Sequence, residues 1–170
     1  MTKKVTLKII KNNMNIQKRL NININNYKDF SEKFSSIELE IIPIQNKHRH
    51  IINVQTKDTK YFHFYLNDNK EENKINNNDK ISKINIIIDY QIKSFKDLFY
   101  YCECIESINF KKFYRNNITS MIAMFLGCKS LIELNITNFN TNNAINIRYI
   151  FYGCSSLKEL IITNFNTPIL

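Results

Sequence analysis

The feature that most constrains the fold of this chain is a 26-residue repeat in its C-terminal half. Phe125-Leu126-Gly127-Cys128 returns as Phe151-Tyr152-Gly153-Cys154, and Ile136–Thr141 returns without a change as Ile162–Thr167. A weaker copy begins 26 residues earlier, at Phe99. The chain has only two glycines, and both occupy the same place in the repeat. Self-similarity at a fixed period in this range is typical of solenoids, whose successive copies stack and bury a shared core.

Each copy divides into two parts with different apolar spacing. Ile118, Met121 and Phe125 fall on one face of a helix, and Gly127 follows where a left-handed residue ends a helix at little cost. The next residues, 131–136 (LIELNI), have the spacing of a short strand that is reached through a turn. The sequence therefore predicts an α/β solenoid whose 26-residue units each combine a short helical turn with a parallel strand.

Residues 1–90 form a strand-rich section that precedes about three repeat units at 91–170. Alternating or β-branched stretches predict strands at residues 5–9, 22–25, 37–41, 50–54, 61–65 and 83–88. The aromatic spacing within 27–34 predicts one short amphipathic helix, and the polar stretch 67–80 predicts a loop. We interpret the section as a cap over the first open end of the solenoid. Its element order also allows a small β-grasp-like fold.

The net charge of the chain is +9, from 24 basic and 15 acidic residues. No run of five or six like charges concentrates this excess, so it favours a solvated surface over a nucleic-acid partner. The N-terminus lacks the apolar core of a leader peptide, and no stretch approaches about 18 consecutive apolar residues. The sequence as written predicts a cytoplasmic protein without a transmembrane segment. A cell-surface or secreted protein is the alternative if the chain is a fragment.

Three of the four cysteines, Cys102, Cys128 and Cys154, recur at the repeat period. Stacked copies would place them in one column about 5 Å apart, and we expect them to be buried free thiols because cysteine packs as a small apolar side chain. Cys102-Glu103-Cys104 offers too few ligands for zinc, and two glycines do not suffice for a phosphate-binding loop. No pairing of a nucleophile with a base is visible. The sequence therefore predicts no metal, no cofactor and no catalytic activity.

The repeated string resembles the BspA-type leucine-rich repeat family. The LxxLxL strand motif followed by an aromatic residue is typical of leucine-rich repeats, and residues 124–131 and 138–141 fit the pattern MFxGCxSLxxLxLSxFxTxxVTxM of this branch. The likeness covers roughly residues 94–167, and the first copy departs from it at Tyr101 and Arg115. The resemblance implies a leucine-rich repeat solenoid. It also implies a surface antigen-like protein with a role in adhesion or protein binding.

The leading hypothesis is a non-catalytic protein-interaction module that binds a protein partner of unknown identity through the exposed face of the parallel sheet. Solenoids build extended binding surfaces in this way. The expected contact residues are the outward side chains of the three strand segments. They are Ser107, Asn109, Lys111, Glu133, Asn135, Thr137, Glu159, Ile161 and Thr163.

Two other functions remain open. The first is an electrostatic binder of nucleic acid or anionic surfaces through the N-terminal section, where basic and aromatic residues cluster. The cluster comprises Lys57, Lys60, Tyr61, Phe62 and Phe64. The second is an enzyme with its site in the same section.

The C-terminal end of the chain is apolar where a finished solenoid end is polar. Ile161, Ile162, Phe165, Ile169 and Leu170 lie close to the terminus. We therefore expect either that the protein continues with further repeats or that the chain self-associates through this end.

Overall fold

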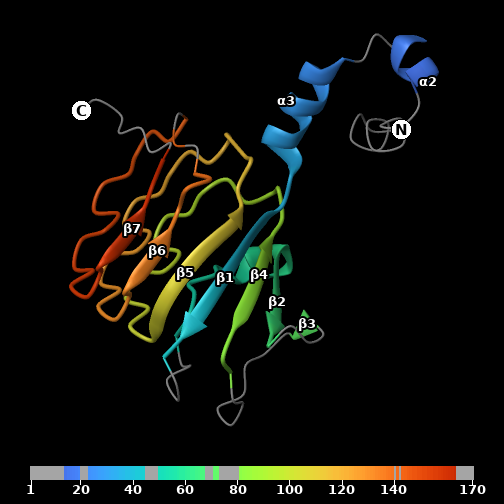
Figure 1. Cartoon of the computed structure of the whole chain (residues 1–170). Helices are drawn as coiled ribbons and strands as arrows, with labels where there is room; N and C mark the ends of the chain where they lie inside the picture. Colours follow the sequence, from blue (N-terminus) through green and yellow to red (C-terminus); the bar gives the residue numbers. More distant parts are fainter. Residues whose placement is uncertain are drawn as a thin grey trace.

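The computed structural model describes residues 14–19, 23–44, 50–67, 71–72, 81–139, 141 and 143–163. Its elements are α2 (Met14–Arg19), α3 (Ile24–Phe34), β1 (Ile37–Pro43), the 3-10 helix η1 (Thr56–Tyr61), β2 (Phe62–Leu66), β3 (Glu71–Glu72), β4 (Ile84–Ile88), β5 (Ile105–Lys112), β6 (Glu133–Asn135) and β7 (Glu159–Ile161). All of these strands belong to one twisted sheet, with α3 extending beyond one end of β1 (Figure 1).

The seven strands of the described sheet follow the order β3-β2-β4-β1-β5-β6-β7. β1 lies between β4 and β5 and is antiparallel to both, whereas β5, β6 and β7 are parallel to one another. The sheet is therefore continuous across the predicted domain boundary at residues 90 and 91. The division of the chain into two domains stays a prediction.

The predicted α/β solenoid, with a helical turn in every copy, is wrong. The structure is a mixed sheet, and its described residues from 81 to 163 contain no helix. Residues 122–127 form consecutive turns instead, in which Ala123 (φ 50°) and Gly127 (φ 71°) have left-handed backbones. An α-helix needs uniform right-handed dihedrals. The helical spacing of the apolar residues misled the prediction because turns of three or four residues bring side chains inward at the same intervals.

The backbone hydrogen bonds of these turns run in two directions. The Met124 N–H donates to Met121 O within its own turn (3.2 Å), whereas the Ala123 N–H donates to Arg148 O in the next copy (2.9 Å). In a helix every interior N–H would serve its own helix. Here alternate N–H groups tie one copy to the next, so the turns pair sideways as strands do.

Equivalent residues of successive copies lie side by side in the structure. Ser107 pairs with Glu133, and Glu133 pairs with Glu159, each 26 residues further on. On the turn side, Ser94 bridges to Ser120, and Ser120 bridges to Asn146. The core lies between the sheet and the turns, where the repeated phenylalanines form a column. The rings of Phe99 and Phe125 stack with centroids 5.5 Å apart, and those of Phe125 and Phe151 are 5.9 Å apart.

Strand β5 carries an irregularity that explains the spacing of its own buried residues, Ile105, Ile108 and Phe110. Its register against β1 shifts so that Ile42 pairs with Ser107 while Pro43 pairs with Ile105. Glu106 is therefore the extra residue of a β-bulge, which places two outward residues between two buried ones. Because of this bulge, Ile108 follows Ile105 after three residues, and Phe110 follows Ile108 after the usual two.

The predicted helix at 27–34 is confirmed, although α3 begins earlier, at Ile24. Asn23 caps it, because its side chain accepts from the N–H groups of Asn25 and Asn26 while the Asn26 side chain accepts from the Asn23 N–H. This capping box satisfies helix N–H groups that have no partner within the helix. The predicted strand at 22–25 is therefore wrong for residues 23–25. The strand predicted at 5–9 lies outside the described residues.

The other predictions for the N-terminal section have mixed outcomes. Strands predicted at 37–41, 61–65 and 83–88 are confirmed as β1, β2 and β4 within a residue or two. The strand predicted at 50–54 is wrong for the described residues, because Asn53 bonds to a turn instead. Its N–H donates to Leu98 O, and its side-chain amide donates to the carbonyls of Asp97 and Tyr100. The short strand β3 falls inside the predicted loop at 67–80.

Arg115 is fully buried and binds backbone carbonyls at the start of the first copy. Its guanidinium donates to Asp89 O (3.0 Å), to Ile92 O and to Asn117 Oδ1 (3.0 Å). Burial lowers the pKa of Arg115 to about 10, yet the group stays charged at neutral pH. In the next copy the same position is the buried Thr141. Arg115 thus supplies donors where the first copy begins.

Candidate functional site

The candidate site is the outer face of the sheet, meaning the face that points away from the core and the turns. Along one line, six side chains stand opposite one another on six neighbouring strands. In spatial order they are Tyr65, Asn85, Glu40, Asn109, Asn135 and Ile161. The sheet backbone fixes their spacing at roughly 5 Å from strand to strand. The result is a rigid row with an aromatic ring at one end and polar side chains along most of its length.

The structure places most of the predicted contact residues on this face. Ser107, Asn109 and Lys111 belong to β5, Glu133 and Asn135 to β6, and Glu159 and Ile161 to β7. Thr137 and Thr163 lie two residues beyond β6 and β7, and the Thr163 hydroxyl donates to Thr137 O (2.6 Å). The repeat brings these residues together in rows, as expected. Their role in binding stays a prediction.

The sequence prediction missed the half of the outer face that β1, β4 and β2 provide. Glu38 and Glu40 alternate with buried residues of β1, and Asn85 and Ile87 do the same on β4. Alternation had marked both stretches as half-buried strands. Nothing in the local sequence indicated that β1 would lie directly beside β5.

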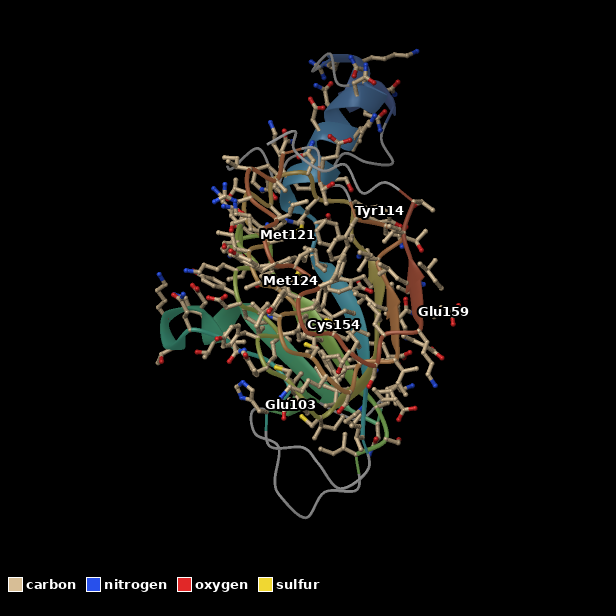
Figure 2. The ribbon with its side chains drawn as sticks, turned by 90° about the vertical axis from the view of Figure 1, so that its left-hand side faces the viewer. Glu103, Tyr114, Met121, Met124, Cys154 and Glu159 are labelled. Atoms are coloured by element: carbon tan, nitrogen blue, oxygen red, sulfur yellow. The ribbon has the colours of Figure 1, made fainter. Side chains whose placement is uncertain are left out.

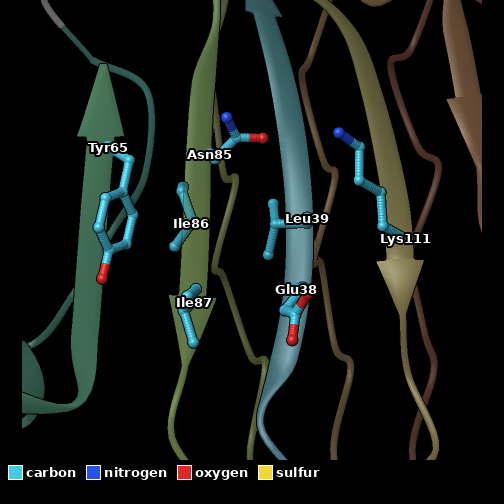
Figure 3. Close-up of a pocket in the computed structure, with 7 residues that line it drawn as sticks. All are labelled: Glu38, Leu39, Tyr65, Asn85, Ile86, Ile87 and Lys111. Atoms are coloured by element: carbon cyan, nitrogen blue, oxygen red, sulfur yellow. The ribbon is translucent and has the colours of Figure 1, made fainter. Parts of the chain in front are cut away.

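A shallow hollow of about 340 Å³ lies on this half of the outer face. Figure 3 shows Tyr65 along one side of it and Glu38 and Lys111 along the other, with Asn85 and Ile87 of β4 between them. In the hollow, the side chains of β4 stand between longer ones on β2 and β1, and Lys111 of β5 lies beyond β1. It could receive a single side chain of a partner.

Ion pairs hold the longer side chains around the hollow. Glu40 accepts from Lys111 (2.5 Å) and lies 3.9 Å from Lys83, while Glu38 accepts from Lys112 (2.6 Å). Exposed pairs of this kind contribute only about 0–1 kcal/mol each to stability. Their effect here is to fix where charges of both signs stand, which favours selective recognition over general attraction.

The basic-aromatic cluster of the N-terminal section is only partly available at the surface. Lys57 and Lys60 are exposed on η1, and the Lys60 ammonium lies 5.0 Å from the centre of the Tyr61 ring. Phe62 is buried in the core, and Phe64 packs against it. Base stacking needs an exposed aromatic face, so these two phenylalanines are poorly placed for it.

The four cysteines are free thiols held among apolar residues. Cys128 donates to Phe99 O (3.0 Å), Cys154 donates to Phe125 O (3.1 Å), and Cys104 donates to His50 O (2.8 Å). Burial raises the pKa of Cys128 to about 12 and raises that of Cys102 further. A thiol that stays protonated is a poor nucleophile and a poor metal ligand. The predicted column of buried thiols is confirmed for Cys102 and Cys128, whereas Cys154 is half-buried.

The described residues contain no group of three or more His, Cys, Asp or Glu side chains arranged to hold a metal ion. Within the same part of the chain, no helix is both long and apolar enough to cross a membrane.

The chain matches a known protein family. The model of a family described as "Mycoplasma protein of unknown function, DUF285" matches residues 63–169. This range covers β2 from its second residue, β3, β4 and the three copies of the repeat. Neither a search of curated proteins nor a search of solved structures found a match.

Proposed function

The chain belongs to the DUF285 family of Mycoplasma proteins of unknown function, and from this premise we propose that it is a non-catalytic module that binds a protein partner through the outer face of its sheet. The observation that carries the proposal is the row from Tyr65 to Ile161 across six strands. A face fixed by backbone pairing loses little conformational entropy on binding, so more of the contact energy appears as affinity.

The mixed chemistry of the outer face supports a protein as the partner. It combines an aromatic ring, amides, and acidic and basic groups that are already paired within the protein. Protein interfaces are typically this mixed, with a few aromatic and charged anchors among polar neighbours. The row carries one charge, Glu40, which is already paired with Lys111, so it offers little to a purely electrostatic partner.

The thiols support the non-catalytic part of the proposal. Cys128 is fully buried, and its raised pKa keeps it protonated at neutral pH. Nucleophilic catalysis needs the thiolate. The thiol column is therefore better suited to packing than to chemistry.

The repeated string also resembles that of the BspA-type family, whose members are implicated in adhesion. This resemblance supports a partner that is displayed on a cell surface, and a surface or secreted location for the chain is part of the same proposal. The self-association expected at the C-terminal end is a separate proposal, because it concerns the edge of β7 and not the outer face.

Paired charge variants test the proposed face. Asn109→Arg adds a charge to the middle of the outer row, and Ile145→Arg adds the same charge to an exposed position on the turn side. The immobilised chain would be exposed to surface proteins of the source cells. We expect a retained protein to be lost with Asn109→Arg and kept with Ile145→Arg. Equal retention by both variants would reject the outer face as the binding site.

Salt separates this function from the electrostatic alternative. Binding through phosphate contacts weakens steeply as salt rises, by roughly 10³–10⁵ between 50 and 200 mM for 6–10 contacts. A partner that packs on the outer face should lose far less. Removal of Lys57 and Lys60 together would abolish the electrostatic mode and leave the proposed one intact.

A further inference from the structure

The edge of β7 has the composition of a buried strand but the exposure of a surface strand. Leu160 is 37% exposed and Ile162 is 44% exposed, whereas their equivalents Leu134 and Ile136 are 0% exposed. No strand among the described residues pairs with the outer side of β7. Figure 2 looks onto this end of the molecule, with Glu159 on β7 at one side and Cys154 nearer the centre.

The exposure extends from the strand into the core layer of the third copy. Leu131 and Cys128 are fully buried, but their equivalents Leu157 and Cys154 are only partly buried. In the second copy these positions are covered by the third copy, through the pairing of β6 with β7 and the bonds between turns. The end of the sheet therefore continues the same interface that joins the copies to one another.

We infer that two copies of this chain associate edge to edge through β7, with the strands antiparallel about a two-fold axis at Leu160. Such an interface uses the same surface on both partners and closes at two copies. Antiparallel pairing about this axis puts Leu160 opposite Leu160 of the second copy. It keeps the inner faces of both sheets on the same side, so the two apolar layers meet.

The charges at this edge are compatible with the arrangement. With the axis at Leu160, Glu159 stands opposite Ile161 of the second copy, and Lys158 stands opposite Ile162. No like charges oppose each other along this stretch, and opposed like charges are what destabilise cross-strand pairs. Protected edges commonly carry a lysine or proline within the strand, and β7, ELI, carries neither.

Two adjacent residues of β7 allow a sharp test. Leu160 faces the core layer and Ile161 faces outward, yet their exposures are similar, at 37% and 42%. Leu160→Lys would place two ammonium groups against each other at the axis. Ile161→Lys would place each ammonium opposite Glu159 of the second copy. We expect Leu160→Lys to weaken dimerisation at least tenfold and Ile161→Lys to preserve or strengthen it.

Sedimentation equilibrium of the full 170-residue chain over a wide concentration range measures the effect. The expected result is a monomer–dimer equilibrium for the wild type and for Ile161→Lys, with Leu160→Lys monomeric and still folded by circular dichroism. Hydrogen exchange of the wild type provides a readout without mutation, because the Leu160 amide at the centre of the proposed pairing should gain protection as concentration rises. A wild type that stays monomeric, that grows beyond a dimer, or that shows no concentration-dependent protection at β7 would overturn the inference.

Discussion

The second and third copies of the repeat share a stretch of identical sequence but have different environments. Ile136-Thr137 in the second copy and Ile162-Thr163 in the third are the same residues in the same order. Ile136 is nevertheless fully buried, whereas Ile162 is 44% exposed. The second copy lies between two neighbours, and among the described residues the third has a neighbour on one side only. Burial in this part of the protein is therefore a property of position in the array and not of the sequence of a copy.

The largest expected difference between the two copies concerns their thiols. Cys128 should react with a thiol reagent only when the structure opens, which costs up to the global stability of about 5–15 kcal/mol. Cys154 is half-buried and should label orders of magnitude faster under native conditions. Mass spectrometry of peptides after timed labelling measures both rates. Equal rates would show that the third copy protects its thiol as well as the second does.

The same thiols predict how stability changes with pH. Burial raises the pKa of Cys128 from 9.0 to about 12, so the folded state holds this proton more tightly than the unfolded chain. The tighter hold on this proton adds to the free energy of unfolding. That contribution is complete below pH 9, where both states keep the proton, and is lost as pH rises from 9 towards 12. Denaturant titrations at pH 8 and pH 10 should show lower stability at pH 10. Cys128→Ala should reduce that difference.

The aromatic column gives the next largest effect. Phe125→Ala empties a fully buried site between two other rings and should cost about 3–5 kcal/mol. Phe151 is only partly buried, so Phe151→Ala should cost clearly less. Thermal or chemical unfolding of both variants tests this order. A larger loss for Phe151→Ala would mean that the third copy is as enclosed as the second.

In the first copy, the buried Arg115 should contribute more to stability than an exposed arginine of the third copy does. Arg115→Met keeps much of the volume but leaves the carbonyls of Asp89 and Ile92 without their donor. Each buried acceptor left unpaired costs about 1–3 kcal/mol. The matched control is Arg148→Met, at an exposed arginine of the third copy, which should change stability by less than about 0.5 kcal/mol. Similar melting temperatures for the two variants would remove the structural role of Arg115.

Alanine substitutions at Gly127 and Gly153 distinguish the cost of backbone strain from the cost of steric crowding. Both have left-handed dihedrals, with φ of 71° and 75°, so an alanine at either position should cost about 1–2 kcal/mol. At Gly127 the new methyl would also lie only 2.9 Å from the Tyr101 ring, whereas at Gly153 its nearest neighbour is 3.5 Å away. Gly127→Ala should therefore be the more destabilising variant in a denaturant titration. The reverse order would indicate that the Tyr101 ring moves aside freely.

The smallest expected loss of stability comes from substitutions at Ile136 and Ile162, which lie in the identical stretch. Ile136→Val should cost about 0.5–1.5 kcal/mol, as is usual for the loss of one buried methyl group. Ile162→Val should be close to neutral at low protein concentration, because Ile162 is partly exposed. The difference between the two variants, measured by urea unfolding, is a direct estimate of what a neighbouring copy contributes at this position.

Sequence patterns predicted the neighbours within the array but not the shape of its turns. The 26-residue period correctly indicated that Ser107, Glu133 and Glu159 would stand in one row. The period could not show that the turns of one copy bond to those of the next. Buried apolar residues recur every three or four positions both in helices and in consecutive turns. Only the backbone dihedrals at positions such as Ala123, where no glycine gives a signal, distinguish the two.

The N-terminal half of the candidate site was less accessible to prediction for a different reason. Alternation correctly marked β1 and β4 as half-buried strands. Their place in the sheet depends on pairing between residues about 70 positions apart, such as Glu40 with Asn109. Local patterns carry no information on such partners. The hollow between Tyr65 and Lys111 depends on that pairing and could not be anticipated.

The hydrogen bonds between copies have a consequence for how a gene for this protein can change. Most of them join residues 25 or 26 positions apart, as in Met121 to Asn146 and Ile132 to Glu106. Inserting one codon inside a copy would change the separation of every donor and acceptor that flank the insertion, and so put that copy out of step with its neighbours. Duplicating a whole block of 26 codons would leave each donor facing an equivalent acceptor. The chain can therefore lengthen by complete copies without disturbing the hydrogen bonds between those already present.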